Sequence, residues 1–140
     1  MRHAKRTCKL GRTSSHRRCL FANLLKSLIL HDRVETSLAK GKELKRRADK
    51  MVTLSKKNTL ASRRRAVAEL MIRYNNLSPK EKKAVKQGDL SSYNDDRKVI
   101  GKLFGELGSK YHERSGGYTR LIRTRLRTGD AGERVIVEYI

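Results

Sequence analysis

Apolar residues recur every three or four positions between residues 13 and 32 of this 140-residue chain. This spacing predicts a helix with one apolar stripe that packs against a core. Thr13 or Ser14 stands where a side-chain oxygen can cap the free amide groups at the start of the helix. The stripe consists of Leu20, Phe21, Leu24, Leu25 and Leu28.

The next segments predict one strand and two more helices. Residues 33–38 alternate between apolar and polar, which is typical of a half-buried strand. Residues 39–58 and 59–74 return to a helical period. Their expected core positions are Leu44, Ala48, Met51, Val52 and Ser55 in the first of these helices, and Leu60, Val67, Leu70, Met71 and Tyr74 in the second.

The second half of the chain begins with a weaker pattern. Residues 75–94 contain the only proline and few core candidates, so we expect a polar surface excursion with a short helix at most. Residues 95–108 predict a fourth helix that Gly108 ends. Residues 118–127 and 134–140, joined by the turn sequence TGDAGE, predict a hairpin.

This order of elements, helix, strand, three helices and two strands, indicates an α+β fold in two layers. We expect the helices to pack on a small three-stranded mixed sheet. Residues 13–140 are expected to form a single domain, since a chain of this length builds one core. Residues 1–12 form a basic arm that carries no acid and little apolar surface, so we expect it to become ordered only on a partner.

The charge of the chain favours a large anionic partner. Lys and Arg total 35 against 14 Asp and Glu, which gives a net charge of +21. Self-repulsion on this scale destabilises the isolated compact state. Nucleic acid is the first candidate partner and an anionic membrane surface the second. A membrane partner is not expected, because neither a lipidation signal nor an apolar run of membrane length is evident.

The predicted strand at residues 118–127 carries a row of arginines. A strand period places Arg123, Arg125 and Arg127 on one face, about 6.6 Å apart along the strand. Guanidinium groups bind phosphates bidentately, so this row suits an RNA or DNA backbone. Ile122 and Leu126 are expected on the opposite, core-facing side with Tyr118, and Leu121 is an apolar exception on the arginine face. The alternative is an edge strand that its charges protect against aggregation.

The sequence SGGY precedes this row, where its glycines allow the backbone to approach a sugar–phosphate chain closely; alternatively, they only form a turn. Aromatic residues make up 5% of the chain and Trp is absent. This scarcity favours binding to a folded backbone over the stacking of single-stranded bases. Charge alone does not separate an RNA-binding protein from a basic DNA-binding or nucleoid-compacting protein, because both bind phosphates.

Catalytic chemistry is not indicated. The acids are scattered over cationic faces and the four histidines are isolated. SGGY lacks the glycine spacing of a dinucleotide fingerprint and the ending of a nucleotide-triphosphate loop. We therefore expect no enzyme activity, no cofactor and no small-molecule substrate.

The two cysteines do not form a disulfide framework, and the absence of a signal peptide indicates a reducing cytosol. A zinc site remains an alternative, because thiolate and imidazole are the usual ligands of zinc. The irregular spacing of the candidate ligands disfavours that site. These candidates are His3, Cys8, His16 and Cys19.

Four segments, in this order and at these intervals, resemble the family of the seventeenth protein of the bacterial large ribosomal subunit. They are MRH at 1–3, LGRTSSHRR at 10–18, RVETSLAKGKELK at 33–45 and RSGGYTR at 114–120. The resemblance implies a structural, cytoplasmic protein of the ribosome that binds large-subunit ribosomal RNA near the outer end of the nascent-peptide tunnel. It also implies neighbouring large-subunit ribosomal proteins as partners, and the same two-layer fold.

The chain departs from the family pattern at residues 75–94, which look longer than the usual link, and in the absence of a proline near the hairpin. Charge, the arginine row and the resemblance together predict the RNA-binding residues. They are Arg2, His3, Lys5, Arg6, Lys9, Arg12, Ser14, Ser15, His16, Arg17, Arg18, Lys40, Lys42, Lys45, Arg46, Arg63, Arg64, Arg114, Gly116, Gly117, Tyr118, Arg120, Arg123, Arg125 and Arg127.

Overall fold

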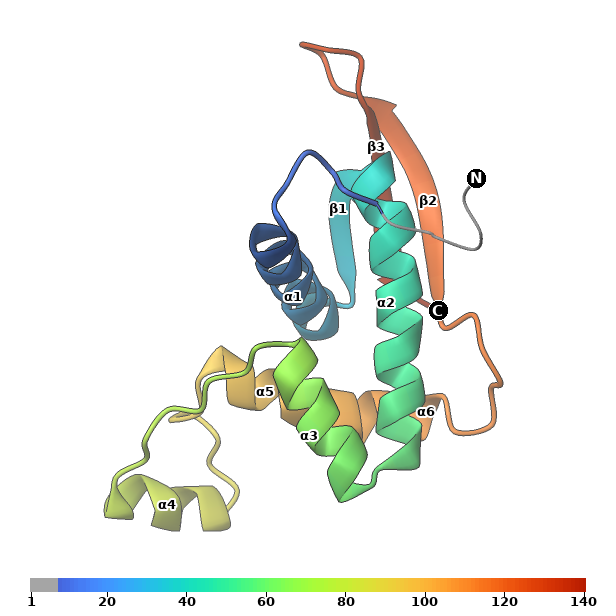
Figure 1. Ribbon diagram of the computed structural model, residues 1–140. Helices are drawn as coiled ribbons and strands as arrows, with labels where there is room; N and C mark the ends of the chain where they lie inside the picture. The colour runs from blue at the N-terminus through green and yellow to red at the C-terminus, as the bar shows by residue number, and fades with distance from the viewer. Residues whose placement is uncertain (1–7) are drawn as a thin grey trace.

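A computed structural model describes residues 8–140 as an α+β fold, as expected (Figure 1). The described elements are α1 (Ser14–His31), β1 (Arg33–Ser37), α2 (Leu38–Lys57), α3 (Leu60–Glu69), α4 (Pro79–Lys86), α5 (Asp95–Lys102), the π-helical turn η1 (Leu103–Leu107), α6 (Gly108–Lys110), β2 (Thr119–Leu126) and β3 (Glu133–Tyr139). The order predicted from the sequence is therefore confirmed, with α4 added inside the polar segment.

The three-stranded sheet has the order β1, β3, β2 and is antiparallel throughout. The expectation of a mixed sheet is wrong. β1 and β2 do run in the same direction, but β3 lies between them and runs opposite to both. Val137 of β3 pairs with Val34 on one side and with Leu121 on the other.

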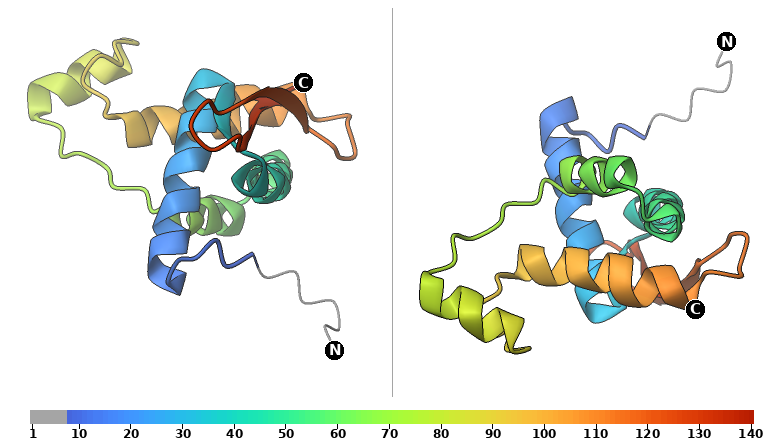
Figure 2. Two further views of the ribbon diagram at one scale, coloured as in Figure 1. Left: turned by 90° about the horizontal axis from the view of Figure 1, so that it is seen from above. Right: turned by 90° about the horizontal axis from the view of Figure 1, so that it is seen from below.

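The helical layer packs on the sheet through α1 and α2, and α5 with η1 crosses beneath them (Figures 1 and 2). Gly41 marks the closest approach of α2 to the sheet. A Cβ atom there would lie 2.5 Å from the Cγ2 atom of Val135, so only glycine fits. The core between the layers contains fully buried Leu28, Leu44, Met51, Leu103 and Val137, among others.

The predicted first helix is confirmed, including its cap. The Thr13 hydroxyl accepts a hydrogen bond from the backbone N–H of His16 at 3.4 Å. Phe21, Leu25 and Leu28 of the predicted stripe are buried. The apolar spacing was a sufficient signal here because most of the stripe faces the core.

The third helix ends earlier than predicted, at Glu69, and its core face was predicted only in part. Leu60, Met71 and Tyr74 are 65%, 39% and 48% exposed. Leu70 is buried as predicted, and it shares the buried face with Ser62 and Ala66, at four-residue spacing. Small side chains form most of this face, so counting large apolar residues did not find it.

Gly108 does not end the fourth helix as predicted. It has helical backbone angles, and the chain continues through α6 to Lys110. A Cβ atom on Gly108 would lie 3.3 Å from the carbonyl oxygen of Ser55 in α2. The glycine therefore permits a close crossing of two helices.

Residues 75–94 extend away from the helices and the sheet (Figure 2). Within this segment, α4 has no buried residue. The two ends of the segment are connected to α5 and to the residues after α3 by several hydrogen bonds, which are described below.

Candidate nucleic-acid interface

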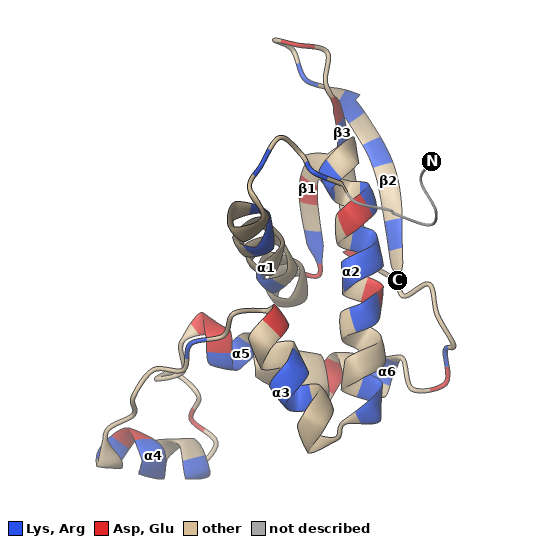
Figure 3. Ribbon diagram, in the orientation of Figure 1, with Lys and Arg blue, Asp and Glu red and all other residues tan. Residues whose placement is uncertain are grey.

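Lys and Arg lie along α1, α2, α3 and β2, and most acids of the described part of the chain lie beside them (Figure 3). Asp32 forms an ion pair with Lys102 at 2.7 Å, and Glu35 forms one with Arg134 at 3.0 Å. The few acids are thus largely neutralised inside the protein. The remaining cations are available to an external anion.

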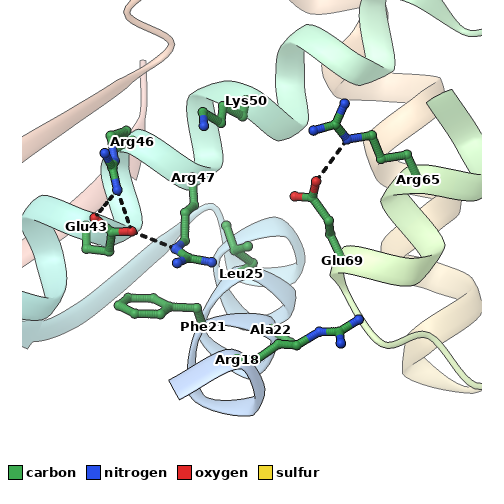
Figure 4. Close-up of a pocket in the computed structure, with 10 residues that line it drawn as sticks. All are labelled: Arg18, Phe21, Ala22, Leu25, Glu43, Arg46, Arg47, Lys50, Arg65 and Glu69. Atoms are coloured by element: carbon green, nitrogen blue, oxygen red, sulfur yellow. Dashed lines mark hydrogen bonds and ion pairs between the residues drawn. The ribbon is translucent and has the colours of Figure 1, made fainter. Parts of the chain in front are cut away.

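A cationic groove of about 320 Å³ opens between α1, α2 and α3 (Figure 4). Phe21, Ala22 and Leu25 form its apolar floor. Its charged residues are the cations Arg18, Arg46, Arg47, Lys50 and Arg65 and the acids Glu43 and Glu69. The cations exceed the acids by three, so the groove attracts anions.

Glu43 holds two of these arginines in place. Its carboxylate accepts hydrogen bonds from Arg46 at 2.7 and 2.8 Å and from Arg47 at 2.9 Å. Burial opposes its ionisation, but the hydrogen bonds and charges of both arginines outweigh burial and leave the pKa of Glu43 below its usual value. The Arg47 guanidinium also lies 4.5 Å from the centre of the Phe21 ring. The two guanidinium groups are therefore positioned before any ligand arrives.

The start of α1 lies beside this groove and carries no acid in its first turn. Arg12 lies 2.6 Å from the Nε2 atom of His16, and Arg17 donates to the carbonyl of Arg12 at 3.3 Å. Arg18 reaches across to the carbonyl of Ala68 in α3 at 3.4 Å. Exposed Ser14 and Ser15 complete a helix terminus that favours a negative ligand.

The outer side of α2 adds a row of cations. Lys42, Arg46 and Lys50 are exposed and lie four residues apart, so they share one side of the helix. Lys40 and Lys45 are half-buried, and within residues 8–140 they form no ion pair with an acid. This row continues the positive charge of the groove.

The two predicted arginines of α3 differ in their surroundings. Arg63 donates to the Asn58 side chain at 3.0 Å and lies over the Phe104 ring at 5.0 Å. Arg64 is exposed, and the described residues give it no acid partner. Only Arg64 is therefore wholly available to an external phosphate.

The SGGY segment forms a turn before β2. Arg114 donates to the carbonyl of Gly116 at 3.1 Å, and its own carbonyl accepts from Lys56 at 2.7 Å. Gly117 has φ +62°, which favours glycine, and a Cβ atom on Gly116 or Gly117 would meet nothing within 4 Å. The outside of the turn is therefore open to a close ligand.

Tyr118 is a core residue, as expected for its side of the predicted strand, so its predicted part in RNA binding is limited to the backbone of the turn. It is 2% exposed and its hydroxyl donates to the carbonyl of Arg114. The tyrosine stabilises the SGGY turn from inside. Its position next to two glycines indicated a turn, and the strand period indicated the core-facing direction of its ring.

The faces predicted for β2 are reversed. Leu121 packs against the core, whereas Ile122 and Leu126 are 40% and 62% exposed. A bulge also interrupts the strand, because Arg123 pairs with Val135 while Leu126 pairs with Glu133. Strict alternation ends there, so the three arginines do not form one straight row. The sequence pattern contains no sign of this extra residue.

All three hairpin arginines are exposed, but two of them have local partners. Arg127 forms an ion pair with Asp130 at 2.8 Å, and Arg123 lies 4.0 Å from Glu133. Arg120 pairs with Glu138 on the neighbouring strand. Arg125 alone among the three has no acid partner within residues 8–140.

Of the predicted residues of α1, α2 and α3, the structure brings Arg18 and Arg46 together in the groove, and the others lie outside its lining. The SGGY turn and the β2 arginines lie on the hairpin side. Lys9 is exposed just before α1. Arg2, His3, Lys5 and Arg6 lie outside the described residues. Sequence reasoning missed Arg47, Lys50 and Arg65 of the groove. The four-residue spacing of Arg46 and Lys50 was the signal that could have found one of them.

Cys8 and Cys19 are free thiols. Within residues 8–140, no three His, Cys, Asp or Glu side chains gather as metal ligands. No helix in this part of the chain combines the length and apolarity that crossing a bilayer requires.

The α+β fold with this cation-rich surface defines a basic protein suited to a polyanionic partner. Comparison with known families gives a match to ribosomal protein L17 over residues 20–140. The chain is 58% identical to the large ribosomal subunit protein bL17 of Protochlamydia amoebophila, 59% to that of Chlamydia abortus and 56% to that of Chlamydia trachomatis serovar D. Each alignment covers 100% of this chain and 99% of the relative.

The chain belongs to the ribosomal protein L17 family. It is therefore a structural, non-enzymatic constituent of the bacterial large ribosomal subunit, in the cytoplasmic ribosome. The family expected from the four sequence segments is confirmed.

Proposed function

We propose that this protein binds large-subunit ribosomal RNA through phosphate contacts. The contact surface consists of the start of α1, the exposed row on α2, the cationic groove, the SGGY turn and Arg125. The groove carries the proposal, because Glu43 orders Arg46 and Arg47 there and leaves an excess of positive charge. Preorganised guanidinium groups lose less entropy on binding a phosphate.

The placement of aromatic residues supports recognition of the backbone over recognition of bases. Five of the seven aromatic side chains are buried, namely Phe21, Phe104, Tyr111, Tyr118 and Tyr139. Buried rings offer no platform for unstacked bases. Charge and shape therefore supply the binding energy, and family membership favours ribosomal RNA over DNA as the partner.

The location near the outer end of the nascent-peptide tunnel, beside other large-subunit proteins, stays a proposal. It is supported by the resemblance of the four sequence segments to the family. The basic arm at residues 1–12 belongs to the same proposal. Identification of the nucleotides and proteins that cross-link to the chain in purified large subunits tests this location.

Replacement of the α2 lysines tests the contact surface. The variant K42Q/K45Q/K50Q removes three charges without removing Arg46 or Glu43. We expect its affinity for a large-subunit RNA fragment to be lower by a factor of about ten or more. The slope of the logarithm of the binding constant against the logarithm of the salt concentration should also become smaller, by about one unit for each phosphate that no longer has a lysine partner. Fluorescence anisotropy at several salt concentrations measures both quantities.

The control variant K57Q/K98Q/K110Q removes the same charge from exposed residues of α2, α5 and α6 that lie outside the proposed surface. It should retain most of the affinity. Equal losses in both variants would contradict a localised contact surface and leave only a diffuse charge effect.

A further inference from the structure

The helix α4 and its flanking residues stand apart from the proposed contact surface (Figure 1). We call residues 76–92 the α4 arm. No residue of α4 is buried, so tertiary packing does not explain its helical structure. The arm therefore contributes little to the stability of the fold, and the chemistry of its exposed side chains indicates its function.

The arm begins and ends at a clasp of hydrogen bonds. Asn75 donates to the carbonyl of Ser92 at 2.8 Å, and Asn94 donates to the carbonyl of Arg73 at 2.7 Å. Arg97 donates to the side-chain and backbone oxygens of Asn75, both at 2.9 Å. These bonds bring the two ends of the arm together and fix them relative to α5.

Aromatic rings and a partly exposed ion pair strengthen the clasp. The Arg97 guanidinium lies 4.9 Å from the centre of the Tyr74 ring and 5.3 Å from that of Tyr93. Asp96 accepts from the backbone N–H of Arg73 at 2.6 Å and pairs with Lys26 of α1 at 2.7 Å. The base of the arm is thus anchored to the helical layer, which sets the direction in which the arm extends.

The four lysines of α4 occupy one side of the helix. At about 100° per residue, Lys80, Lys82, Lys83 and Lys86 fall within an arc of about 160°. All four are exposed, whereas Glu81, Ala84 and Val85 on the other side are half-buried. Within residues 8–140, no acid forms an ion pair with any of the four.

Both acids of the arm bond to backbone amides. Glu81 accepts from the N–H of Ser78 at 2.6 Å in a capping box at the helix start. Asp89 accepts from the N–H of Ser91 at 2.9 Å. The acids therefore stabilise the local structure of the arm, and the lysine side remains uncompensated.

We infer that the lysine side of α4 is a second RNA-docking surface, which the clasp holds at a distance from the cationic groove. It contacts phosphates of a ribosomal RNA segment other than the one bound by α1 and α2. Clustered ammonium groups on an exposed helix complement a phosphate backbone, and a fixed base reduces the entropy lost on docking. This inference rests on the proposed function, because it requires ribosomal RNA to be the partner.

Directed hydroxyl-radical probing in reconstituted large subunits tests the inference. In a full-length chain with Cys8→Ser and Cys19→Ser, an iron chelate is attached to Gln87→Cys at the end of α4 or, in a second sample, to Lys45→Cys on α2. We expect both probes to cleave ribosomal RNA, at two separate sets of nucleotides. Cleavage from position 45 alone would overturn the inference and leave the proposed function intact. Cleavage from neither position would contradict the proposed function itself.

Two variants separate the lysines from the clasp. With the probe at position 87, K80Q/K82Q/K83Q/K86Q should reduce cleavage about tenfold at 200 mM salt, because glutamine does not neutralise the RNA phosphates. Arg97→Ala should spread the cleavage over more nucleotides, whereas Arg97→Lys, which retains the charge, should spread it less. Unchanged cleavage in the quadruple variant would overturn the role of the lysines.

Discussion

At the scale of single residues, Glu43 is the acid that organises the cationic groove. It is almost buried and accepts three hydrogen bonds from Arg46 and Arg47. An acid in the middle of a cationic surface therefore contributes to anion binding, because it fixes the guanidinium groups in one geometry.

Glu43→Gln removes this charge while it keeps the size of the side chain. We expect the free energy of unfolding at pH 7 to fall by about 1 to 3 kcal/mol, since the variant lacks the charge-assisted hydrogen bonds. The pKa of Glu43 is lowered in the folded state, so its stabilisation is present above the ordinary value of 4.5 and disappears as the pH falls through the folded pKa. Urea unfolding at pH 7 and pH 3 measures the difference, which should shrink at pH 3.

Glu106→Gln provides the control, because Glu106 is exposed on η1 and has no ion-pair partner among the described residues. It should change stability little at either pH. A difference between wild type and Glu43→Gln that stays the same at pH 3 would show that the charge of Glu43 is not what stabilises the fold.

The hairpin arginines differ in their local partners, which predicts different effects on RNA binding. Arg125→Gln should weaken binding and lower the salt slope by about 1, because this side chain has no acid partner in the described structure. Arg127→Gln should have the smaller effect, because Asp130 already neutralises Arg127. Filter binding at several salt concentrations checks the order, and the reverse order would rule out the hairpin contact as described.

At the scale of elements, the position in which α2 packs on the sheet determines where its cationic side chains point. Gly41 lets the helix approach Val135, and the opposite side of α2 then carries Lys42, Arg46 and Lys50. A shift of this helix would move the whole row and the groove with it. Packing and binding are therefore coupled through one helix.

Gly41→Ala should destabilise the fold by about 1 to 3 kcal/mol, because its Cβ atom would lie 2.5 Å from a Val135 methyl carbon. Gly101→Ala is the matched control in α5, where a Cβ atom meets nothing within 4 Å. This second change should stabilise the helix by about 0.5 to 1 kcal/mol. Thermal unfolding of both variants measures these opposite signs, and a neutral Gly41→Ala would mean that the sheet adapts without cost.

Elements with large apolar stripes could be predicted from the sequence, whereas those shaped by small residues could not. The apolar stripe of α1 allowed its core-facing side to be predicted correctly. The face of α3, with Ser62 and Ala66, did not, because its close packing depends on the absence of large side chains. The bulge in β2 was also invisible, since Arg123, Thr124 and Arg125 continue the alternating pattern through it.

The candidate site was predictable in its charges and less so in its geometry. Lys42, Arg46 and Arg125 were found because cations exceed acids in their segments, although Glu43 pairs with Arg46. The groove was not found, because Arg18, Lys50 and Arg65 come from three helices that only the fold brings together.

At the scale of the whole molecule, net charge has opposite consequences for folding and for binding. The chain carries +21, so repulsion destabilises the isolated protein and attraction favours its complex with RNA. Salt weakens both effects. Between about 50 and 300 mM salt, we expect the free energy of unfolding to rise while the affinity for ribosomal RNA falls. Urea unfolding and anisotropy titrations in the same buffers provide the two curves, and curves that change in the same direction would contradict this prediction.

Ultraviolet cross-linking in purified large subunits, followed by mass spectrometry of the linked peptides, tests the central proposal most directly. The proposal predicts that peptides joined to ribosomal RNA come mainly from residues 12–18, 40–50 and 114–125. Cross-links confined to α5, η1 and α6, with none from these segments, would show that the RNA lies against another side of the protein and would contradict the proposed contact surface.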